Sequence, residues 1–344
     1  MQQCKVEPLI LAEKESSNQF WKVQVALWGT VILWASAYVF IRIGLQSFHP
    51  GSLSFFRYVV ASLTMLILYA RLKRKNRLSL SQILQLIFLG ALGIGFYDLL
   101  LNYGERTVPA GIAAFLVGIR PIISIVLAMI LLKEKVVPKY WLGVAVSIIG
   151  MLMIALGESD VTGFDYGVIY IIGAALLGSY YIVGQKPLLL KIHPLEAAFW
   201  AILGGALVMI VFSPLLIDDL HHASGASIFA AIYLGIFPGA IGYTIWGYAL
   251  TYTPASKAAL YLYALPIFAT LLGFVMLSEV PILLSFLGGL IALLGAIIGN
   301  YFYLHSKRIT KPTTNLINQN QNIADQYPEL LYNNNNRNNK NSLF

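Results

Sequence analysis

The chain has 344 residues, of which 58% are hydrophobic and only 11% are charged, whereas a soluble domain has about 25% charged residues. A chain this apolar does not cover itself with polar surface in water, so the composition predicts a membrane protein. The formal net charge is +8, but the basic residues cluster between apolar spans, which argues against nucleic acid as a partner. The single cysteine, Cys4, excludes an internal disulfide and a multi-cysteine metal site.

Hydrophobic runs predict ten transmembrane helices, because a spanning helix needs about 20 apolar residues. A polar segment, residues 1–22, precedes them and lacks the basic start and short apolar core of a signal peptide. After the last span the chain becomes polar and asparagine-rich, so we expect residues 305–344 to be disordered. The predicted spans are residues 23–46, 51–70, 83–104, 109–131, 139–157, 166–186, 194–217, 227–249, 254–277 and 281–304.

The distribution of basic residues predicts the orientation, because cytoplasmic loops carry an excess of lysine and arginine. With the N-terminus in the cytoplasm, the basic cluster at 71–77 and Lys133 lie inside, and Arg106 alone lies outside. The acidic residues Glu158 and Asp160 then also lie outside. We therefore expect a multi-pass protein of the cell's inner membrane with both termini in the cytoplasm.

A long internal repeat predicts the architecture. It divides the chain into two halves, 23–157 and 166–304, each with five predicted helices. Because five is odd, the second half enters the membrane upside down relative to the first. The predicted fold class is an all-α membrane protein of ten helices in two five-helix inverted-topology repeats, as in many secondary transporters. A shift of 145 residues superposes Tyr103 on Tyr248, Pro109-Ala110 on Pro254-Ala255, Pro121 on Pro266, Glu134 on Glu279, Gly143 on Gly288 and Gly150 on Gly295.

The repeated residues resemble the drug/metabolite transporter superfamily, in its ten-helix EamA-type branch. The first arm of the pattern reads LWASAYVFIRIGL at 33–45 and SFFRYVVASL at 54–63, and the second arm is the repeated run described above. The resemblance covers residues 25–304 and implies alternating-access movement of small metabolites, often export of amino acids. Asp98 and Arg120 depart from the family pattern, in which apolar or small polar residues are more typical, so no named substrate follows.

Charged residues inside the spans are the first candidates for a binding site, because such residues usually face a cavity or a partner. Arg57, Asp98 and Arg120 are expected to converge, with Asp98 paired to one arginine and the other free. Two interpretations stay open: a structural ion-pair network, and a site that handles substrate or protons. The 145-residue shift places Asp98 on Tyr243 and Arg120 on Leu265, so the scaffold is duplicated and the charges are not, which favours a ligand.

Other polar and aromatic residues complete the candidate substrate site, although tryptophan and tyrosine also collect at membrane interfaces. Lys257 and Tyr261 are four residues apart and share a helix face. Trp34, Tyr38 and Tyr97 also belong to helices that we expect around a cavity. The full predicted substrate-binding set is Arg57, Asp98, Asn102, Arg120, Tyr243, Trp246, Lys257 and Tyr261.

Two prolines and two stripes of small residues describe the helix geometry. Pro121 and Pro266 fall inside spans at matched positions, where each removes a backbone hydrogen bond and frees the carbonyl of Val117 or Leu262. Each is either a packing kink or a hinge beside the central cavity.

Two stripes of small residues favour close helix packing within one chain, and a homodimer stays open as the alternative. They are Gly143, Ser147 and Gly150, and Gly288, Ala292, Gly295 and Gly299.

The sequence shows no metal-binding cluster, phosphate loop or catalytic triad, so we expect neither an enzyme nor a cofactor. The predicted function is a secondary transporter of small polar metabolites, amino acids or related compounds, working by alternating access and in the direction of export. Its partners are then a small-molecule substrate and the lipid bilayer. The alternatives are a lipid-linked carrier, a non-transporting membrane scaffold, and a cation or multidrug exporter.

Overall fold

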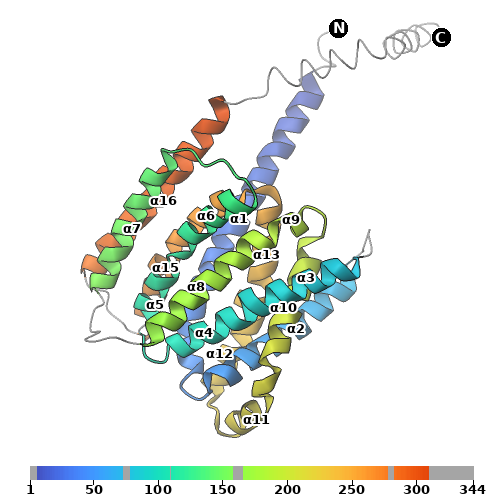
Figure 1. The fold of residues 1–344 in the computed structure, drawn as a ribbon, viewed down its shortest axis with the longest axis vertical. Helices are drawn as coiled ribbons and strands as arrows, with labels where there is room; N and C mark the ends of the chain where they lie inside the picture. The colour runs from blue at the N-terminus through green and yellow to red at the C-terminus, as the bar shows by residue number, and fades with distance from the viewer. Residues whose placement is uncertain (1–5, 73–77, 109, 158–165, 278–282, 310–344) are drawn as a thin grey trace, which may run out of the picture. The chain divides into compact units, whose positions relative to one another are not determined.

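The structure, a computed structural model, describes residues 6–72, 78–108, 110–157, 166–277 and 283–309, and these residues contain helices and no strand (Figure 1). The chain forms two compact units, Met1–Asn300 and Tyr301–Phe344, and the described residues 301–309 of the second are helical. The elements are α1 Val6–Gly44, α2 Pro50–Arg71, α3 Leu80–Gly90, η2 Ala91–Phe96, α4 Tyr97–Gly104, α5 Ala110–Val117, α6 Arg120–Leu131, α7 Tyr140–Gly157, α8 Tyr166–Gly184, α9 Lys186–Leu189, α10 Pro194–Met209, η3 Ile210–Phe212, α11 Ser213–His222, α12 Gly225–Leu234, η4 Gly235–Gly242, α13 Tyr243–Tyr252, α14 Ala255–Tyr261, η5 Leu262–Ala264, α15 Leu265–Leu277 and α16 Leu283–Ile309.

The predicted all-α membrane fold of ten spans is confirmed. Seven helical segments of the described chain are long and apolar enough to cross a membrane, and three shorter apolar helices occupy the remaining predicted places. Helices extend further than predicted at both ends: α1 begins at Val6, and α16 reaches Ile309, beyond the expected start of the disordered tail. Because adding a residue to an existing helix is easier than starting one, helices continue into polar sequence that the apolar pattern excludes.

Equivalent helices of the two halves share local features that the repeat alone did not predict. The third span of each half contains a π-helical segment, η2 in the first and η4 in the second. The second span of each half begins with a histidine cap: His49 Nδ1 accepts from the Gly51 N–H at 3.2 Å, and His193 Nδ1 accepts from the Leu195 N–H at 3.3 Å. In both, a proline fills the first helical position, where no N–H is needed.

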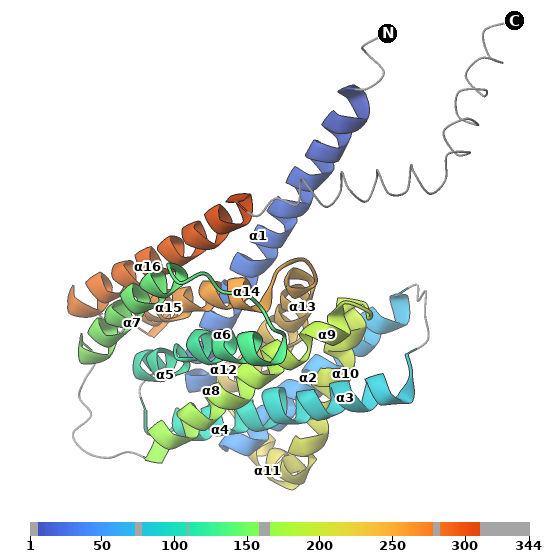
Figure 2. The ribbon, with the colours of Figure 1, turned by 45° about the horizontal axis from the view of Figure 1, so that its top comes forward.

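The two halves of the repeat contact each other through their fourth predicted spans. Helix α6 packs against α14, and α5 packs against α15, so equivalent segments pair reciprocally, as two-fold symmetry requires. The two small-residue stripes also meet, because α7 and α16 lie side by side (Figure 2). A Cβ atom at Gly143 would lie 2.3 Å from the Gly299 nitrogen, and Ser147 Oγ donates to the Ala292 carbonyl at 3.0 Å. The stripes therefore pack within one chain, as expected.

The predicted fourth and ninth spans are each broken immediately before their proline. Helix α5 ends at Val117 and α6 begins at Arg120, while η5 separates α14 from α15. Pro121 and Pro266 thus become the second residues of new helices, where the missing N–H costs nothing. Both prolines are buried. The prediction of a free Leu262 carbonyl is wrong, because the 3₁₀ turn of η5 lets it accept the Leu265 N–H.

Candidate functional site

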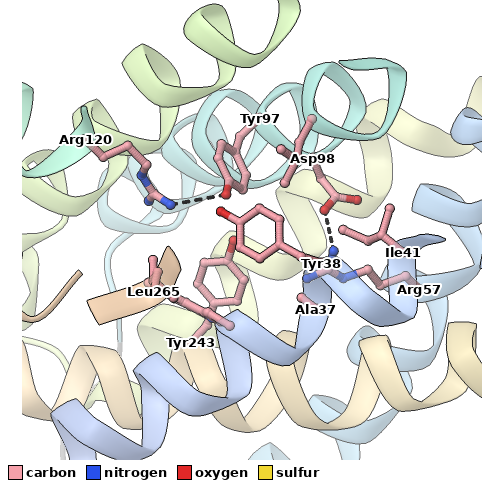
Figure 3. A pocket seen from close by; sticks show the side chains of 11 residues that line it. Ala37, Tyr38, Ile41, Arg57, Tyr97, Asp98, Arg120, Tyr243 and Leu265 are labelled. Atoms are coloured by element: carbon pink, nitrogen blue, oxygen red, sulfur yellow. Dashed lines mark hydrogen bonds and ion pairs between the residues drawn. The ribbon is translucent and has the colours of Figure 1, made fainter. Parts of the chain in front are cut away.

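A small polar cavity lies among α1, α2, α4, α6, α13 and α15, so both halves contribute to its wall (Figure 3). Its volume is about 30 Å³, enough for one or two water molecules. A larger molecule therefore fits only if the surrounding helices move. Its lining residues are Trp34, Ala37, Tyr38, Ile41, Arg57, Tyr97, Asp98, Leu101, Arg120, Tyr243 and Leu265.

The acid of the cavity, Asp98, is paired with Arg57. Helix α2 carries Arg57 and α4 carries Asp98, and Arg57 Nη1 donates to Asp98 Oδ1. The Arg57 guanidinium also lies over the Tyr58 ring, 5.2 Å from its centroid. Asp98 Oδ2 is buried and accepts no hydrogen bond from the described residues. The carboxylate therefore keeps one oxygen available for a further donor.

The second cation, Arg120, is enclosed by aromatic rings. Its Nη1 donates to the Tyr97 hydroxyl at 3.2 Å, and its guanidinium carbon lies 4.8 Å from the Tyr97 ring centroid and 5.8 Å from that of Trp34. Gly178 of α8 makes room for it, since a Cβ atom there would lie 2.8 Å from Nη2. In the part of the chain that the structure describes, Arg120 has no acidic partner and its Nε donates no hydrogen bond.

The position of Arg120 adds to its attraction for anions. It is the first residue of α6, a helix of 12 residues that starts after the break at 118–119. The N-terminus of a helix carries partial positive charge and unsatisfied N–H groups. The two arginines and one aspartate that line the cavity leave one net positive charge. This end of the cavity is therefore suited to a carboxylate or phosphate group.

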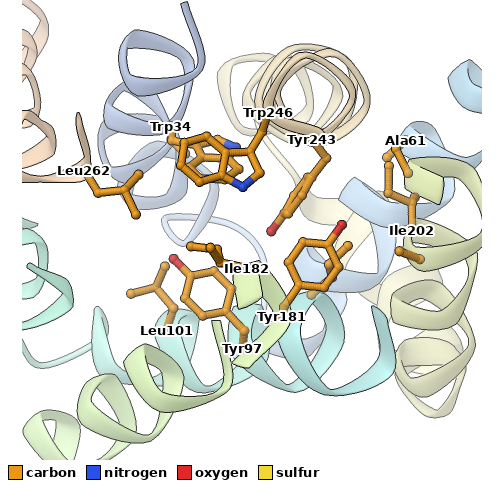
Figure 4. Packing of buried hydrophobic residues seen from close by; sticks show 14 of the residues in the cluster. Trp34, Ala61, Tyr97, Leu101, Tyr181, Ile182, Ile202, Tyr243, Trp246 and Leu262 are labelled. Carbon is orange, nitrogen blue, oxygen red and sulfur yellow. The ribbon is translucent and has the colours of Figure 1, made fainter. Parts of the chain in front are cut away.

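Aromatic side chains cluster beside the cavity (Figure 4). Trp34 donates its Nε1 hydrogen to the Pro238 carbonyl at 3.2 Å, which fixes the indole. Its ring lies 5.3 Å from Tyr243 and 5.2 Å from Trp246, between ring centroids. Tyr181 stands edge-on to Tyr243 at 5.7 Å. Such fixed rings offer flat apolar surface and cation-binding faces at low entropic cost.

The cavity lies where equivalent positions of the two halves meet. Asp98 and Tyr243 are 145 residues apart, as are Arg120 and Leu265, and all four line it. Tyr97, Trp34 and Tyr38 line it too, although they were outside the predicted substrate-binding set. The spacing of Trp34 and Tyr38, four apart on one helix face, was the signal that could have included them.

Two other predicted residues lie close to the cavity without lining it. Asn102 is one turn beyond Asp98 on α4 and donates to Ser54 Oγ at 2.7 Å and to the Pro50 carbonyl at 3.4 Å. Trp246 is fully buried behind Trp34. Trp246 therefore packs behind a lining residue, and Asn102 joins α4 to α2.

The remaining predicted pair, Lys257 and Tyr261, lies elsewhere. Tyr261 donates to Gln24 Oε1 at 2.6 Å and lines a second cavity of about 130 Å³, next to Trp28. Lys257 precedes Tyr261 by one turn on α14, is half-buried, and lines neither cavity. The structure thus gathers Arg57, Asp98, Arg120 and Tyr243 at the first cavity and leaves these two outside it.

Comparison with known proteins identifies the chain's relatives. The model of the EamA-like transporter family matches residues 21–156 and again 165–301. The uncharacterized transporter YdfC of Bacillus subtilis is 36% identical over 279 residues, covering 81% of this chain and 90% of the relative. A probable terminal-alkyne amino-acid exporter of Streptantibioticus cattleyicolor is 33% identical over 292 residues, covering 83% and 97%.

A solved structure shares the fold. A crystal structure covers 84% of this chain and 99% of its own, with a TM-score of 0.66 at 17% sequence identity. The family match spans both halves, and the relatives that it resembles over most of their length bear the names of transporters. The chain is a multi-pass membrane transporter and belongs to the EamA-like transporter family.

Proposed function

We propose that this transporter exports amino acids or closely related small polar metabolites by alternating access, and that the cavity beside Arg120 binds the substrate. The observation that carries the proposal is a buried arginine with no acidic partner among the described residues, next to an aspartate with one free oxygen. A substrate carboxylate would pair with the Arg120 guanidinium through two hydrogen bonds. A substrate ammonium would bind Asp98 Oδ2 and the aromatic faces.

A cation exporter fits these residues less well. A cation is favoured by a site with excess negative charge, whereas the two arginines and one aspartate that line this cavity leave one net positive charge. A cationic substrate without a carboxylate would also leave Arg120 unpaired beside it, and like charges in a low-dielectric site repel strongly. One relative is named as a probable terminal-alkyne amino-acid exporter, and this name supports an amino-acid substrate over a simple cation.

The proposed motion uses a contact between the halves at the end of the bundle that we expect to face the cytoplasm. The Glu134 carboxylate accepts from the backbone N–H groups of Ala255 and Ser256, at 3.0 and 3.1 Å, and from the Ser256 hydroxyl. Tyr140 donates to the Ser256 carbonyl at 2.7 Å. Lys186 donates nearby to carbonyls at the end of α13. Together these bonds close this end.

The repeat supplies an equivalent carboxylate for the opposite end. Glu279 is the counterpart of Glu134 and lies outside the described residues. The sequence repeat predicts opposite ends of the bundle for the two carboxylates. We infer that one contact forms as the other breaks, which would expose the cavity to each side in turn.

The test is exchange of labelled amino acids by purified protein in liposomes. The panel contains propargylglycine, which carries a terminal alkyne, together with alanine, leucine, a lipophilic monovalent cation and an organic phosphate. We expect exchange of amino acids by the wild type, loss of it in Arg120→Gln, and no change in the control Arg106→Gln, whose side chain is exposed. Exchange of the cation alone would refute the proposal, and exchange of the phosphate alone would change the substrate class.

A further inference from the structure

Helix α4 carries a line of buried polar side chains that leads from the cavity to the end of the helix. Asp98, Asn102 and Glu105 are spaced four and three residues apart, so they share one helix face. Their exposed fractions are 0%, 1% and 6%. At the rise of an α-helix the line is about 10 Å long. Leu101, another buried residue of α4, is apolar.

Several atoms along the line accept no hydrogen bond from the described residues: Asp98 Oδ2, Asn102 Oδ1, and both oxygens of Glu105. Buried polar atoms are almost always satisfied, commonly by internal water when protein groups are absent. Ser52 of the facing helix α2 adds another buried hydroxyl without a partner. The line therefore has the composition of a hydrated path through the protein.

Glu105 is the most unusual member of the line. It lies one residue beyond the span Leu80–Gly104, yet it is buried and both carboxylate oxygens lack donors. An ionised carboxylate in such a place loses its hydration, so the neutral acid is favoured. Burial raises the pKa of the Glu105 carboxyl well above its ordinary value, and the Arg42 guanidinium opposes that rise.

The charged groups around Glu105 come from three helices. Arg42 of α1 favours the ionised form, Asp98 of its own helix α4 opposes it, and Arg57 of α2 favours it more weakly. Tyr38 of α1 interacts electrostatically with Glu105 and also lines the cavity. A small movement of α1 against α4 would change the distance to Arg42, and with it the affinity of Glu105 for a proton.

Polar and aromatic groups lie at the end of the helix that carries Glu105. Tyr103 stands edge-on to the His49 ring at 5.7 Å between centroids, and the His49 backbone N–H donates to Asp219 Oδ2 at 2.8 Å. From α8, Gly167 and Ile171 pack against Gly104 and bring no charge to this point. Arg106, the residue after Glu105, is exposed, so Glu105 lies at the edge of the protein interior.

We propose that Glu105 binds a proton that is exchanged for the exported substrate, and that the polar line through Asn102 conducts this proton to Asp98 at the cavity. The proposal rests on the transport function proposed above. A proton from external water binds a Glu105 oxygen, passes through water beside Asn102 Oδ1 to Asp98 Oδ2, and leaves to internal water when the cavity opens inward. One proton enters for each substrate that leaves, and no bond other than O–H is made or broken.

The variant Glu105→Gln separates this role from a structural one, because glutamine keeps the size and polarity of a neutral glutamic acid and cannot release a proton. In liposomes, accumulation of propargylglycine driven by a pH gradient should fall to the level of empty liposomes. Exchange of propargylglycine without a gradient should persist, because exchange needs no net proton movement. The control Asp218→Asn removes an exposed carboxylate from α11 and should preserve both activities.

A second measurement does not depend on the substrate. Infrared spectra of the purified protein in lipid, recorded across a pH titration, should show a protonated carboxyl band that disappears at high pH. The band should be absent in Glu105→Gln and should persist in Asp218→Asn. A wild type that exchanges no amino acid would refute the proposed substrate, and the band would then decide the protonation of Glu105. Full gradient-driven uptake, or an unchanged band, in Glu105→Gln would overturn the proposal.

Discussion

Removing one member of the Arg57–Asp98 pair should destabilise the protein more than removing both. The two side chains are 5% and 0% exposed, so solvent screens them little. Asp98→Asn leaves Arg57 as a second uncompensated cation beside Arg120. Breaking a buried ion pair in this way typically costs about 3–5 kcal/mol. We expect a loss of that size for Asp98→Asn and again for Arg57→Gln.

The double variant Asp98→Asn, Arg57→Gln removes both charges together with their desolvation cost. It should therefore lie closer to the wild type than either single variant, which corresponds to a coupling energy of about 3 kcal/mol or more. The assay is thermal or denaturant unfolding of the four proteins in one detergent, analysed as a double-mutant cycle. Additive losses, with coupling near zero, would show that the two charges do not depend on each other and would refute the reasoning.

Arg120 provides the contrast within the same assay. Arg120→Gln loses a hydrogen bond to Tyr97 and the contacts with two rings, which together are worth about 1–3 kcal/mol. It also removes a buried charge that has no acidic partner among the described residues, and this gain offsets part of the loss. We therefore expect a nearly stable protein that does not transport. A large loss of stability in Arg120→Gln would make the arginine a structural residue.

Three further predictions concern the fold and its motion. Glu134→Gln weakens the acceptor at the N-terminus of α14, so amide hydrogen exchange there should accelerate, and unchanged rates would remove this contact from the proposed motion. Gly150→Leu places a side chain against the α16 backbone, where a Cβ atom alone would lie 2.2 Å from a nitrogen, and should lower the unfolding temperature; Gly225→Ala, with nothing within 4 Å, should not. Reporters fused after Lys75 and Asp160 should read cytoplasmic and external, and the same side for both would exclude the predicted topology.

The sequence was most informative where a residue type has one structural use. Proline and glycine repeated at a fixed interval predicted two equivalent halves, and the glycine stripes predicted which helices pack closely. Helix breaks were only partly visible. Pro121 predicted a kink close to the interruption at 118–119. The π-helical segment η2 leaves no distinct pattern, because its residues are all apolar or glycine, whereas η4 contains Pro238.

The candidate site was predicted in part. The position of a residue within a span predicts its depth in the membrane, but it does not predict the direction in which its side chain points. Arg57 and Arg120 were both acceptable partners for Asp98, and only the packing of α2 against α4 selects Arg57. Lys257 and Tyr261 were predicted to share a helix face in the substrate-binding set, but neither lines the first cavity. Glu105 was overlooked because it follows the apolar run and resembles a loop residue.

The position of the cavity also explains why its charges are not duplicated. Asp98 and Tyr243 are equivalent in the repeat and both line the cavity, and so are Arg120 and Leu265. A residue beside a two-fold axis has its counterpart close by on the other side. An arginine at both 120 and 265 would place two buried cations across a cavity of about 30 Å³, where repulsion is strong because little water screens it. Only one half can therefore carry each charge, and an asymmetric substrate with one carboxylate and one ammonium matches that arrangement.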